Sequence, residues 1–211
     1  MRHILFLFSA LLFLTTGALV VTSCDTTGTN SGDDDEPLNL IRVENLPADP
    51  DTTSGPGRPQ GYGRYAFFDL RDSTIVLRSS NDNRVDSAST EWDIAFRSTD
   101  VIVNGGANGP GQGAAYVAME AFQDVSEVNT DSLNQHAVDD WYTYNANGNN
   151  IVRPTPGKTI VVRTAGGEAY AKIRILSYYE GAPDNPAESD ADSRYYTFEY
   201  MIQTDGSTSF E

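Results

Sequence analysis

The glycine-rich stretch GPGQGA, residues 109–114, has residue types and spacing that could bind a phosphate. Gly109, Gly111 and Ala114 match the dinucleotide-binding pattern G-x-G-x-x-G/A, in which glycines let the backbone approach a pyrophosphate. That chemistry requires a preceding strand and a following helix in a parallel βαβ unit. Here Pro110 interrupts the pattern, no Lys-Ser or Lys-Thr pair follows, and β-forming residues come next. We therefore predict a wide turn whose glycines take positive φ or permit close backbone approach: 105, 106, 109, 111 and 113.

Catalytic patterns are scarce in the rest of the chain. A Ser-His-Asp triad would have to use His136, and the chain has no G-x-S-x-G nucleophile motif. Carboxylate pairs are so frequent in this acidic sequence that none is informative. The oxygen-rich stretches DDWYTYNANGNN and APDNPAESDADS do not fit a calcium-binding EF-hand loop. We therefore predict a protein that is not an enzyme, and a disordered acidic hairpin tip at residues 183–193.

The N-terminus resembles a bacterial lipoprotein signal. Arg2 and His3 precede the apolar run ILFLFSALLFLTTGALVV, which ends at the lipobox-like Val21-Thr22-Ser23-Cys24. The alternative is a transmembrane anchor, because the run approaches the roughly 18 residues that span a bilayer. The lipobox favours a signal peptide over residues 1–23, with Cys24 as the lipidated first residue of the mature chain. Cys24 is also the only cysteine, which excludes an intrachain disulfide.

The residues after Cys24 are small, polar and acidic, including four consecutive acids from Asp33 to Glu36. Such a composition predicts a flexible tether over residues 24–40, followed by one domain over residues 41–211. The whole chain has 30 acidic and 14 basic residues, a formal net charge of −16. That charge repels phosphates, so we predict no nucleic-acid partner.

The domain consists of short β-forming runs separated by turn signals. Strands are predicted in RYAFFDL, STIVLR, WDIAF, VIV, TIVVR, AYAKIRILSYY and YYTFEYMIQ. Alternation places Ala171, Ile173 and Ile175 on a buried face, with Lys172 and Arg174 on a solvated one. Only AMEAFQDVSEV, residues 118–128, has a helical pattern. The sequence predicts an all-β domain of antiparallel sheets, either a sandwich or an open barrel.

The string EWDIAFRSTDVIVNGGANGPGQGAA resembles the signature block of the HmuY family, bacterial haem-binding lipoproteins. From the residues alone, Trp92 belongs in the core, Asp93 caps a turn or pairs with Arg97, and Asn104 is a turn residue. The similarity extends from about residue 60 to 208 and includes the C-terminal strands. It implies an HmuY-like all-β fold, attachment at the outer membrane, and haem uptake beside a TonB-dependent receptor.

The family resemblance also directs attention to residues that could bind haem iron, which proteins hold through His, Met, Cys or Tyr. In the best-known family pattern a histidine follows a tryptophan on a finger-like hairpin. In the matching stretch WYTYNANGNN that position carries Asn145 or Ala146. His136, the one histidine after the signal, is the metal-binding candidate, and a solvated loop imidazole is the competing interpretation.

Tyr142 and Tyr144 alternate beside Trp141 and could stack on a porphyrin, although hairpin packing explains them equally well. Some family members use methionine pairs. Met119 and Met201 are therefore further candidates, but we expect Met119 to pack in the core.

These observations predict a surface-tethered lipoprotein that binds haem or a related tetrapyrrole for uptake through an outer-membrane receptor. Its partners would be haem or a haem-carrying protein and a TonB-dependent receptor, and its contact with the membrane would be through the lipid on Cys24. A periplasmic orientation is the alternative to the cell surface. The alternative function is an accessory or binding lipoprotein that keeps the HmuY fold but has lost haem binding.

Overall fold

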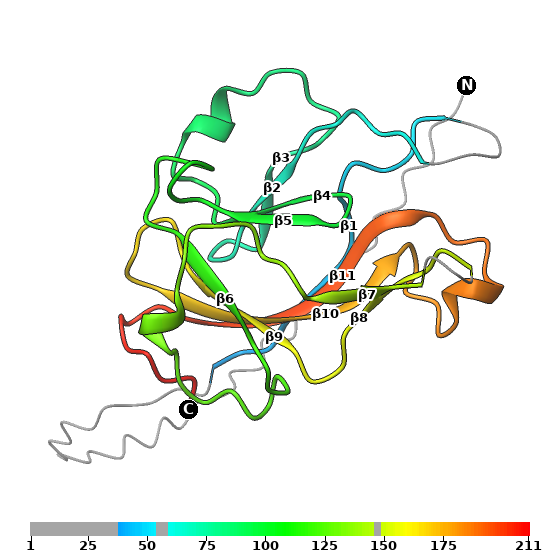
Figure 1. The fold of residues 1–211 in the computed structure, drawn as a ribbon. Helices are drawn as coiled ribbons and strands as arrows, with labels where there is room; N and C mark the ends of the chain where they lie inside the picture. The colour runs from blue at the N-terminus through cyan, green and yellow to red at the C-terminus, as the bar shows by residue number, and fades with distance from the viewer. Residues whose placement is uncertain (1–37, 54–58, 146–148) are drawn as a thin grey trace, which may run out of the picture. The chain divides into compact units, whose positions relative to one another are not determined.

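The computed structural model describes residues 38–53, 59–145 and 149–211, which form β-strands joined by turns (Figure 1). The strands are β1 (Ile41–Pro47), β2 (Ala66–Asp69), β3 (Thr74–Leu77), β4 (Ile94–Arg97), β5 (Asp100–Val103), β6 (Ala114–Ala118), β7 (Tyr142–Tyr144), β8 (Val152–Pro154), β9 (Thr159–Arg163), β10 (Tyr170–Tyr179) and β11 (Ser193–Gln203). The helical segments in these ranges are short 3₁₀ turns, η1 (Val85–Ala88), η2 (Thr130–Ser132) and η3 (Pro186–Glu188).

The strands form two antiparallel sheets and a hairpin. The larger sheet has the order β1-β11-β10-β9-β6, the smaller one has the order β3-β2-β4-β5, and β7 pairs with β8. The sheets do not close into a barrel, so the protein is all-β and consistent with a sandwich. The strands that the sequence predicted correspond to β2 to β5 and β9 to β11.

Aromatic residues from the two sheets meet in the core. Phe96 on β4 lies 4.8 Å from Tyr196 and 5.6 Å from Phe198, both on β11, between ring centroids. Phe68 on β2 also meets Phe198, edge to face at 5.6 Å. All four rings are buried, and each contributes about 1.5–3 kcal/mol to folding by removing apolar surface from water. These contacts hold the two sheets face to face.

The alternation predicted on β10 is correct for one face and wrong at one position of the other. Ala171, Ile173 and Ile175 are buried in the core as expected, but Lys172 is buried too, with 4% of its surface exposed. Its Nζ donates to the carbonyl of Val125 at 2.7 Å and lies over the ring of Phe122. The aliphatic stem of a lysine can cover apolar surface while its ammonium group finds a polar partner. This face of β10 is therefore covered at Lys172, whereas Arg174 on the same face keeps 38% of its side chain exposed, as predicted.

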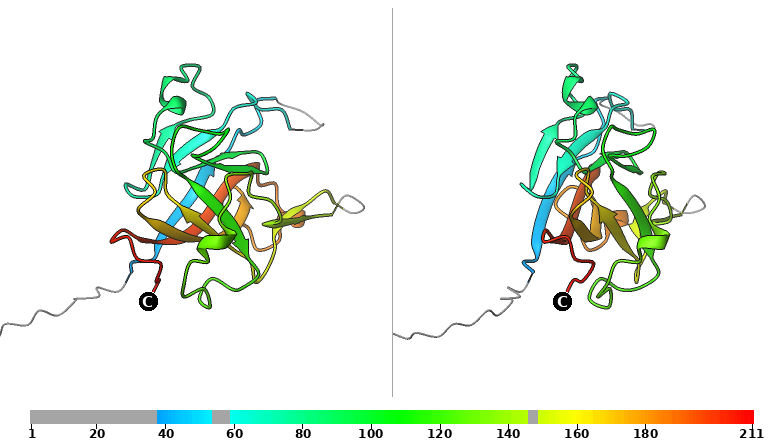
Figure 2. Two further views of the ribbon diagram at one scale, coloured as in Figure 1. Left: turned by 60° about the vertical axis from the view of Figure 1, so that its left-hand side comes forward. Right: turned by 90° about the vertical axis from the view of Figure 1, so that its left-hand side faces the viewer.

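The cover consists of the segment after β6 and the C-terminal segment, which pair with each other. The amide of Val128 donates to Thr208 O at 2.9 Å, and that of Phe210 donates to Ser126 O at 2.8 Å. Figure 2 shows the C-terminal segment, in red, close to the green segment that follows β6. The helical pattern predicted for residues 118–128 is wrong. Phe122, Val125 and Val128 are all buried, but the segment that carries them consists of turns and irregular backbone and not of a helix.

The acidic connection between β10 and β11 is also more ordered than predicted. It contains η3, and Asn185 Oδ1 accepts hydrogen bonds from Arg153 Nη2 at 3.0 Å and from the Ala187 amide at 3.3 Å. The asparagine side chain therefore organises the tip of this hairpin, which the acidic composition alone did not indicate.

The predicted signal peptide and Cys24 lie outside the described residues, as does the tether up to residue 37. Leu38 packs against the apolar cluster under the C-terminal segment, and β1 begins at Ile41. Within the ranges that the structure describes, no helix has the length and apolar character needed to cross a membrane.

Candidate functional site

Residues 93–113 contain a buried junction, which we call the hub: Asp93, Asn104 and the turn from Gly105 to Gly113. Asn104 is fully buried, and its Nδ2 donates to the carbonyls of Ser89 at 2.9 Å and Trp92 at 2.8 Å. Its Oδ1 accepts from the Gly111 amide at 3.0 Å. The side chain therefore fastens three backbone segments, a role more specific than the turn residue expected from the sequence.

The glycines of the hub confirm the predicted wide turn. Gly106 has a φ of 59°, in the left-handed region that favours glycine. A Cβ at Gly109 would overlap the Asn104 amide and come within 2.9 Å of the Trp92 ring, both fully buried. The glycines lead into β6, which pairs antiparallel with β9. The parallel βαβ unit of a dinucleotide site is therefore not formed around this loop.

Asp93 joins the two sheets at the hub. Its carboxylate accepts from the Leu70 amide, after β2, at 3.0 Å and from the Ala165 amide, after β9, at 2.8 Å. Burial raises the pKa of this carboxyl, and the two amide hydrogen bonds oppose the shift. Of the two roles expected for Asp93, the structure shows the first, in which it accepts hydrogen bonds from backbone amides. Arg97, the other expected partner, pairs with Asp100 instead. Trp92 is fully buried, as predicted.

A cleft of about 770 Å³ is lined by residues of the β7–β8 hairpin, the end of β10 and the start of β11. Figure 1 labels these strands. Ligand-binding sites in proteins typically measure about 300–1,000 Å³. We call it the tyrosine cleft, after four of the residues that line it: Tyr142, Tyr144, Tyr178 and Tyr179. The structure therefore brings the two tyrosines predicted from the sequence together with two that were not predicted.

The strand geometry explains how the tyrosines meet. Tyr142 and Tyr144 are two residues apart on β7, so both side chains lie on the same face of the hairpin. The hairpin is fixed to β10 through Tyr179, whose hydroxyl accepts from the Val152 amide at 3.1 Å. Tyr144 is 53% exposed, and its hydroxyl donates to Asn150 Oδ1 at 3.0 Å. The cleft thus has a fixed inner wall and a more exposed outer one.

The inner wall consists of phenols that remain protonated. Tyr178 and Tyr179 are buried, and burial raises the pKa of each hydroxyl above its ordinary value. Tyr178 shares a hydrogen bond of 3.2 Å with the Ser98 hydroxyl. With 4% and 7% of their surface exposed, these two residues present only narrow edges to the cleft, and Tyr142 and Tyr144 supply most of its exposed aromatic surface.

Two further residues of the cleft, Ser98 and Arg194, were missed by sequence reasoning. Ser98 is in the β4–β5 turn and Arg194 is near the start of β11. They are almost a hundred residues apart in the chain, and neither lies in a recognisable motif. From the sequence, Tyr178 and Tyr179 could be predicted only as the end of a strand, because no local pattern indicates which strand end will line a cleft.

No protein-family model matches this chain, and no curated protein matches it either. The tyrosine cleft offers stacking surfaces, hydroxyl groups and one guanidinium, and none of the described residues that line it is Asp, Glu, Lys or His. These groups could stack on a planar ligand and donate hydrogen bonds to polar atoms at its edge.

The other predicted iron ligands lie away from the tyrosine cleft. His136 is exposed on the loop between η2 and β7, where its amide donates to Asn134 Oδ1 at 3.1 Å. It does not line the cleft. The expectation that Met119 packs in the core is wrong, because 75% of its surface is exposed. It follows the last residue of β6, where the chain turns outward, and Met201 is half-buried on β11.

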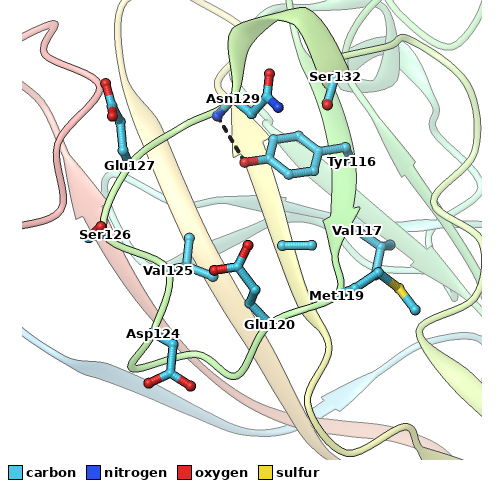
Figure 3. A pocket seen from close by; sticks show the side chains of 11 residues that line it. Tyr116, Val117, Met119, Glu120, Asp124, Val125, Ser126, Glu127, Asn129 and Ser132 are labelled. Carbon is cyan, nitrogen blue, oxygen red and sulfur yellow. Dashed lines mark hydrogen bonds between the residues drawn. The ribbon is translucent and has the colours of Figure 1, made fainter.

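Met119 instead lines a second hollow of about 400 Å³ beside the segment after β6 (Figure 3). Figure 3 shows Tyr116 at this hollow, its hydroxyl accepting a hydrogen bond from the Asn129 amide at 3.0 Å. The charged residues around the hollow are Glu120, Asp124 and Glu127. This negative charge disfavours an acidic ligand here. In the part of the chain that the structure describes, no group of three or more His, Cys, Asp or Glu is placed to hold a metal ion.

Proposed function

We propose that this protein is a surface-tethered lipoprotein that binds haem or a related tetrapyrrole in the tyrosine cleft. The observation that carries the proposal is the cleft itself, with its four tyrosines, its one arginine and its volume of about 770 Å³. Stacking on aromatic rings is a common way to hold a flat macrocycle, and aromatic pairs contribute about 0.5–1.5 kcal/mol beyond area burial. The resemblance of the signature block to the HmuY family supports the same ligand class.

The described residues that line the cleft could stack on the macrocycle, but they include no histidine or methionine to bind its iron as in the family pattern. Asn145, at one position where the family histidine would fall, is described, whereas Ala146 lies outside the described residues. A phenolate is the iron ligand that the cleft can offer, as in the tyrosine-ligated haem proteins. Because Tyr178 and Tyr179 are buried and hydrogen-bonded, we assign this role to Tyr142 or Tyr144 on the hairpin. Bound haem would supply the iron to be delivered, and the protein would hold and shield it.

Haem titration of the detergent-solubilised full-length protein tests this proposal. Binding should produce a saturable Soret change, and Tyr142→Phe or Tyr144→Phe should shift that band and weaken binding about tenfold, a free-energy loss of about 1.4 kcal/mol. His136→Ala is the matched control and should leave the spectrum unaltered. If His136→Ala removes binding while both tyrosine variants retain it, the site is not the tyrosine cleft.

Attachment and partner are further parts of the proposal. Cys24, after a lipobox-like sequence, would carry the lipid, and a TonB-dependent receptor would accept the haem for transport. Cys24→Ala should abolish acyl labelling and release the protein from the membrane fraction. Acyl labelling that persists in Cys24→Ala would contradict lipidation at this residue.

The second candidate function is an accessory lipoprotein that has lost haem binding. The position of His136, exposed and away from the tyrosines, favours it, since the described cleft contains no imidazole. A full-length protein that binds no haem, with its sheets folded by circular dichroism, would decide for this alternative.

A further inference from the structure

The charge inside the tyrosine cleft is opposite to that of the protein as a whole. The sequence has a formal net charge of −16. Yet Arg194 is the one residue with a permanent charge among the described residues that line the cleft. An acidic ligand would be repelled by most of this surface, so a single cation in the cleft has a large influence on where it binds.

The guanidinium of Arg194 is held in place by two backbone carbonyls and an ion pair with the Asp49 carboxylate. Only 13% of the side chain is exposed. Nη1 donates to the carbonyl of Asp49 at 2.9 Å, and Nη2 donates to that of Pro59 at 2.7 Å. The Asp49 carboxylate is 3.8 Å from Nη1 and also accepts from the Gly63 amide. The positive charge is therefore only partly neutralised, and of the five N–H groups of a guanidinium two are bonded to these carbonyls.

Ser98 and Arg194 both have left-handed backbone conformations, with φ of 50° and 70°. Such a conformation is unfavourable for a non-glycine residue and is maintained only where the surroundings enforce it. Ala48 enforces both, because its carbonyl accepts from the Ser98 amide at 2.8 Å and its amide donates to Arg194 O at 2.8 Å. Two residues in this rare conformation are thus fixed side by side on one wall of the cleft.

The hydroxyl groups next to Arg194 complete a polar wall. Ser98 Oγ and the Tyr178 hydroxyl lie 3.2 Å apart, and both residues line the cleft with Arg194. Burial raises the pKa of Tyr178, and the Ser98 hydrogen bond and the charge of Arg194 oppose this shift. Because one of these hydroxyls donates to the other, the guanidinium and one remaining O–H group are the donors, a set that matches the oxygens of a carboxylate.

We propose that Arg194, Ser98 and Tyr178 form a carboxylate-binding subsite in the tyrosine cleft. The ligand class is a planar aromatic compound with an acidic side group, the acid held by Arg194 and the ring system by the tyrosines. This inference rests on the proposed tetrapyrrole-binding function and sharpens it, because it makes the carboxylates of the tetrapyrrole, rather than its metal, the main determinant of orientation and affinity.

The test compares metal-free protoporphyrin with its dimethyl ester, followed by quenching of tyrosine and tryptophan fluorescence in the full-length protein in detergent. The wild-type protein should bind the free acid at least tenfold more tightly than the ester. Arg194→Gln should weaken binding of the acid about tenfold and leave the ester unchanged. Arg153→Gln is the matched control, since Arg153 contacts Asn185 outside the cleft, and it should have no effect.

The comparison of acid and ester in the wild-type protein needs no variant, so it holds even if Arg194→Gln folds poorly. Equal affinity for acid and ester would overturn the subsite and leave the proposed function intact. Binding of neither porphyrin, nor of haem, by the wild-type protein would overturn both. If Arg153→Gln weakens binding of the free acid as much as Arg194→Gln does, the effect is one of overall charge, and this outcome would also overturn the subsite.

Discussion

The hub and the tyrosine cleft use polar side chains in opposite ways. In the hub, Asn104 and Asp93 are buried, and their side-chain oxygens and amide nitrogen bond to backbone groups of the protein. In the cleft, Tyr144 is half-exposed and Arg194 faces a space of about 770 Å³. A buried polar group whose bonds are all made within the fold has none left for a ligand. The most recognisable motif of this sequence therefore builds the fold, whereas the cleft is assembled from unremarkable residues.

Variants of the hub and variants of the tyrosine cleft should therefore differ in their effects. Changes in the hub should lower the free energy of unfolding, because they break bonds between backbone segments or create overlaps. Changes in the cleft should affect ligand binding with little loss of stability. A hub variant that selectively removes tetrapyrrole binding from fully folded protein would contradict the distinction.

Gly109→Val should have the largest effect on stability. The new side chain would overlap the Asn104 amide and the Trp92 ring, and neither can move without breaking buried contacts. We expect a loss of about 4 kcal/mol in the free energy of unfolding, at the upper end of the range for overpacked sites. Urea denaturation followed by fluorescence measures it. Gly166→Val is the control, since a Cβ there has only Arg71 Nη2 nearby, at 3.4 Å, and should cost less than about 1 kcal/mol.

Asn104→Asp should have the next largest effect while hardly changing the size of the side chain. The replacement would place a carboxylate oxygen against the carbonyls of Ser89 and Trp92, which now accept from Nδ2. Two hydrogen bonds are lost and a buried charge keeps one donor, the Gly111 amide, a cost of about 3 kcal/mol. The expected result is a lower urea midpoint at pH 7. An unchanged midpoint would show that the hub tolerates a different bonding pattern.

Asp93 should contribute a dependence of stability on pH with a sign opposite to that of most carboxylates. Burial raises the pKa of Asp93 in the folded protein above its value in the unfolded chain. The folded state therefore binds this proton at a higher pH than the unfolded chain does. The stabilisation from Asp93 appears as the pH falls through the folded-state pKa, and it is fully present below the unfolded-state pKa.

Asp93→Asn removes this titration and also places an amide N–H₂ group against one of the two backbone donors. We expect a loss of about 1–2 kcal/mol at pH 7. The difference between the wild-type protein and the variant should widen between pH 7 and pH 4, as measured by urea unfolding at each pH. A difference that narrows on acidification would mean that the hydrogen bonds from Leu70 and Ala165 outweigh burial and lower the pKa.

Most of the fold could be predicted from the sequence because strand signals are local. The runs RYAFFDL, WDIAF and AYAKIRILSYY alternate or end in turn residues, and they form β2, β4 and β10. Burial on the outer face of β10 could not be predicted, because the residues that cover Lys172 come from residues 119–129 and the C-terminal segment. The three-residue spacing of Phe122, Val125 and Val128 suggested a helix, although tertiary pairing keeps this segment in turns.

The residues of the tyrosine cleft were harder to predict from the sequence than the strands, for a related reason. The positions of Tyr142 and Tyr144 on one hairpin face follow from their alternation, so those two residues could be named in advance. Arg194 and Ser98 meet only because Ala48, on the chain after β1, bonds to both. No local pattern encodes such a three-way contact. Conversely, His136 drew attention as a scarce residue type, and scarcity gives no information about where a side chain lies.

Tyr144→Ser should have the smallest effect on stability and thus gives the sharpest contrast with the hub. Its ring is 53% exposed, and the one hydrogen bond of its hydroxyl is to Asn150, on the exposed part of the same hairpin. Loss of a partly exposed ring and one surface hydrogen bond should change the free energy of unfolding by about 0.5 kcal/mol. Removal of a stacking surface should nevertheless weaken porphyrin binding severalfold. Urea unfolding and a porphyrin titration on the same sample separate the two effects. A stability loss as large as that of Asn104→Asp would mean that the cleft wall, like the hub, is part of the folding core.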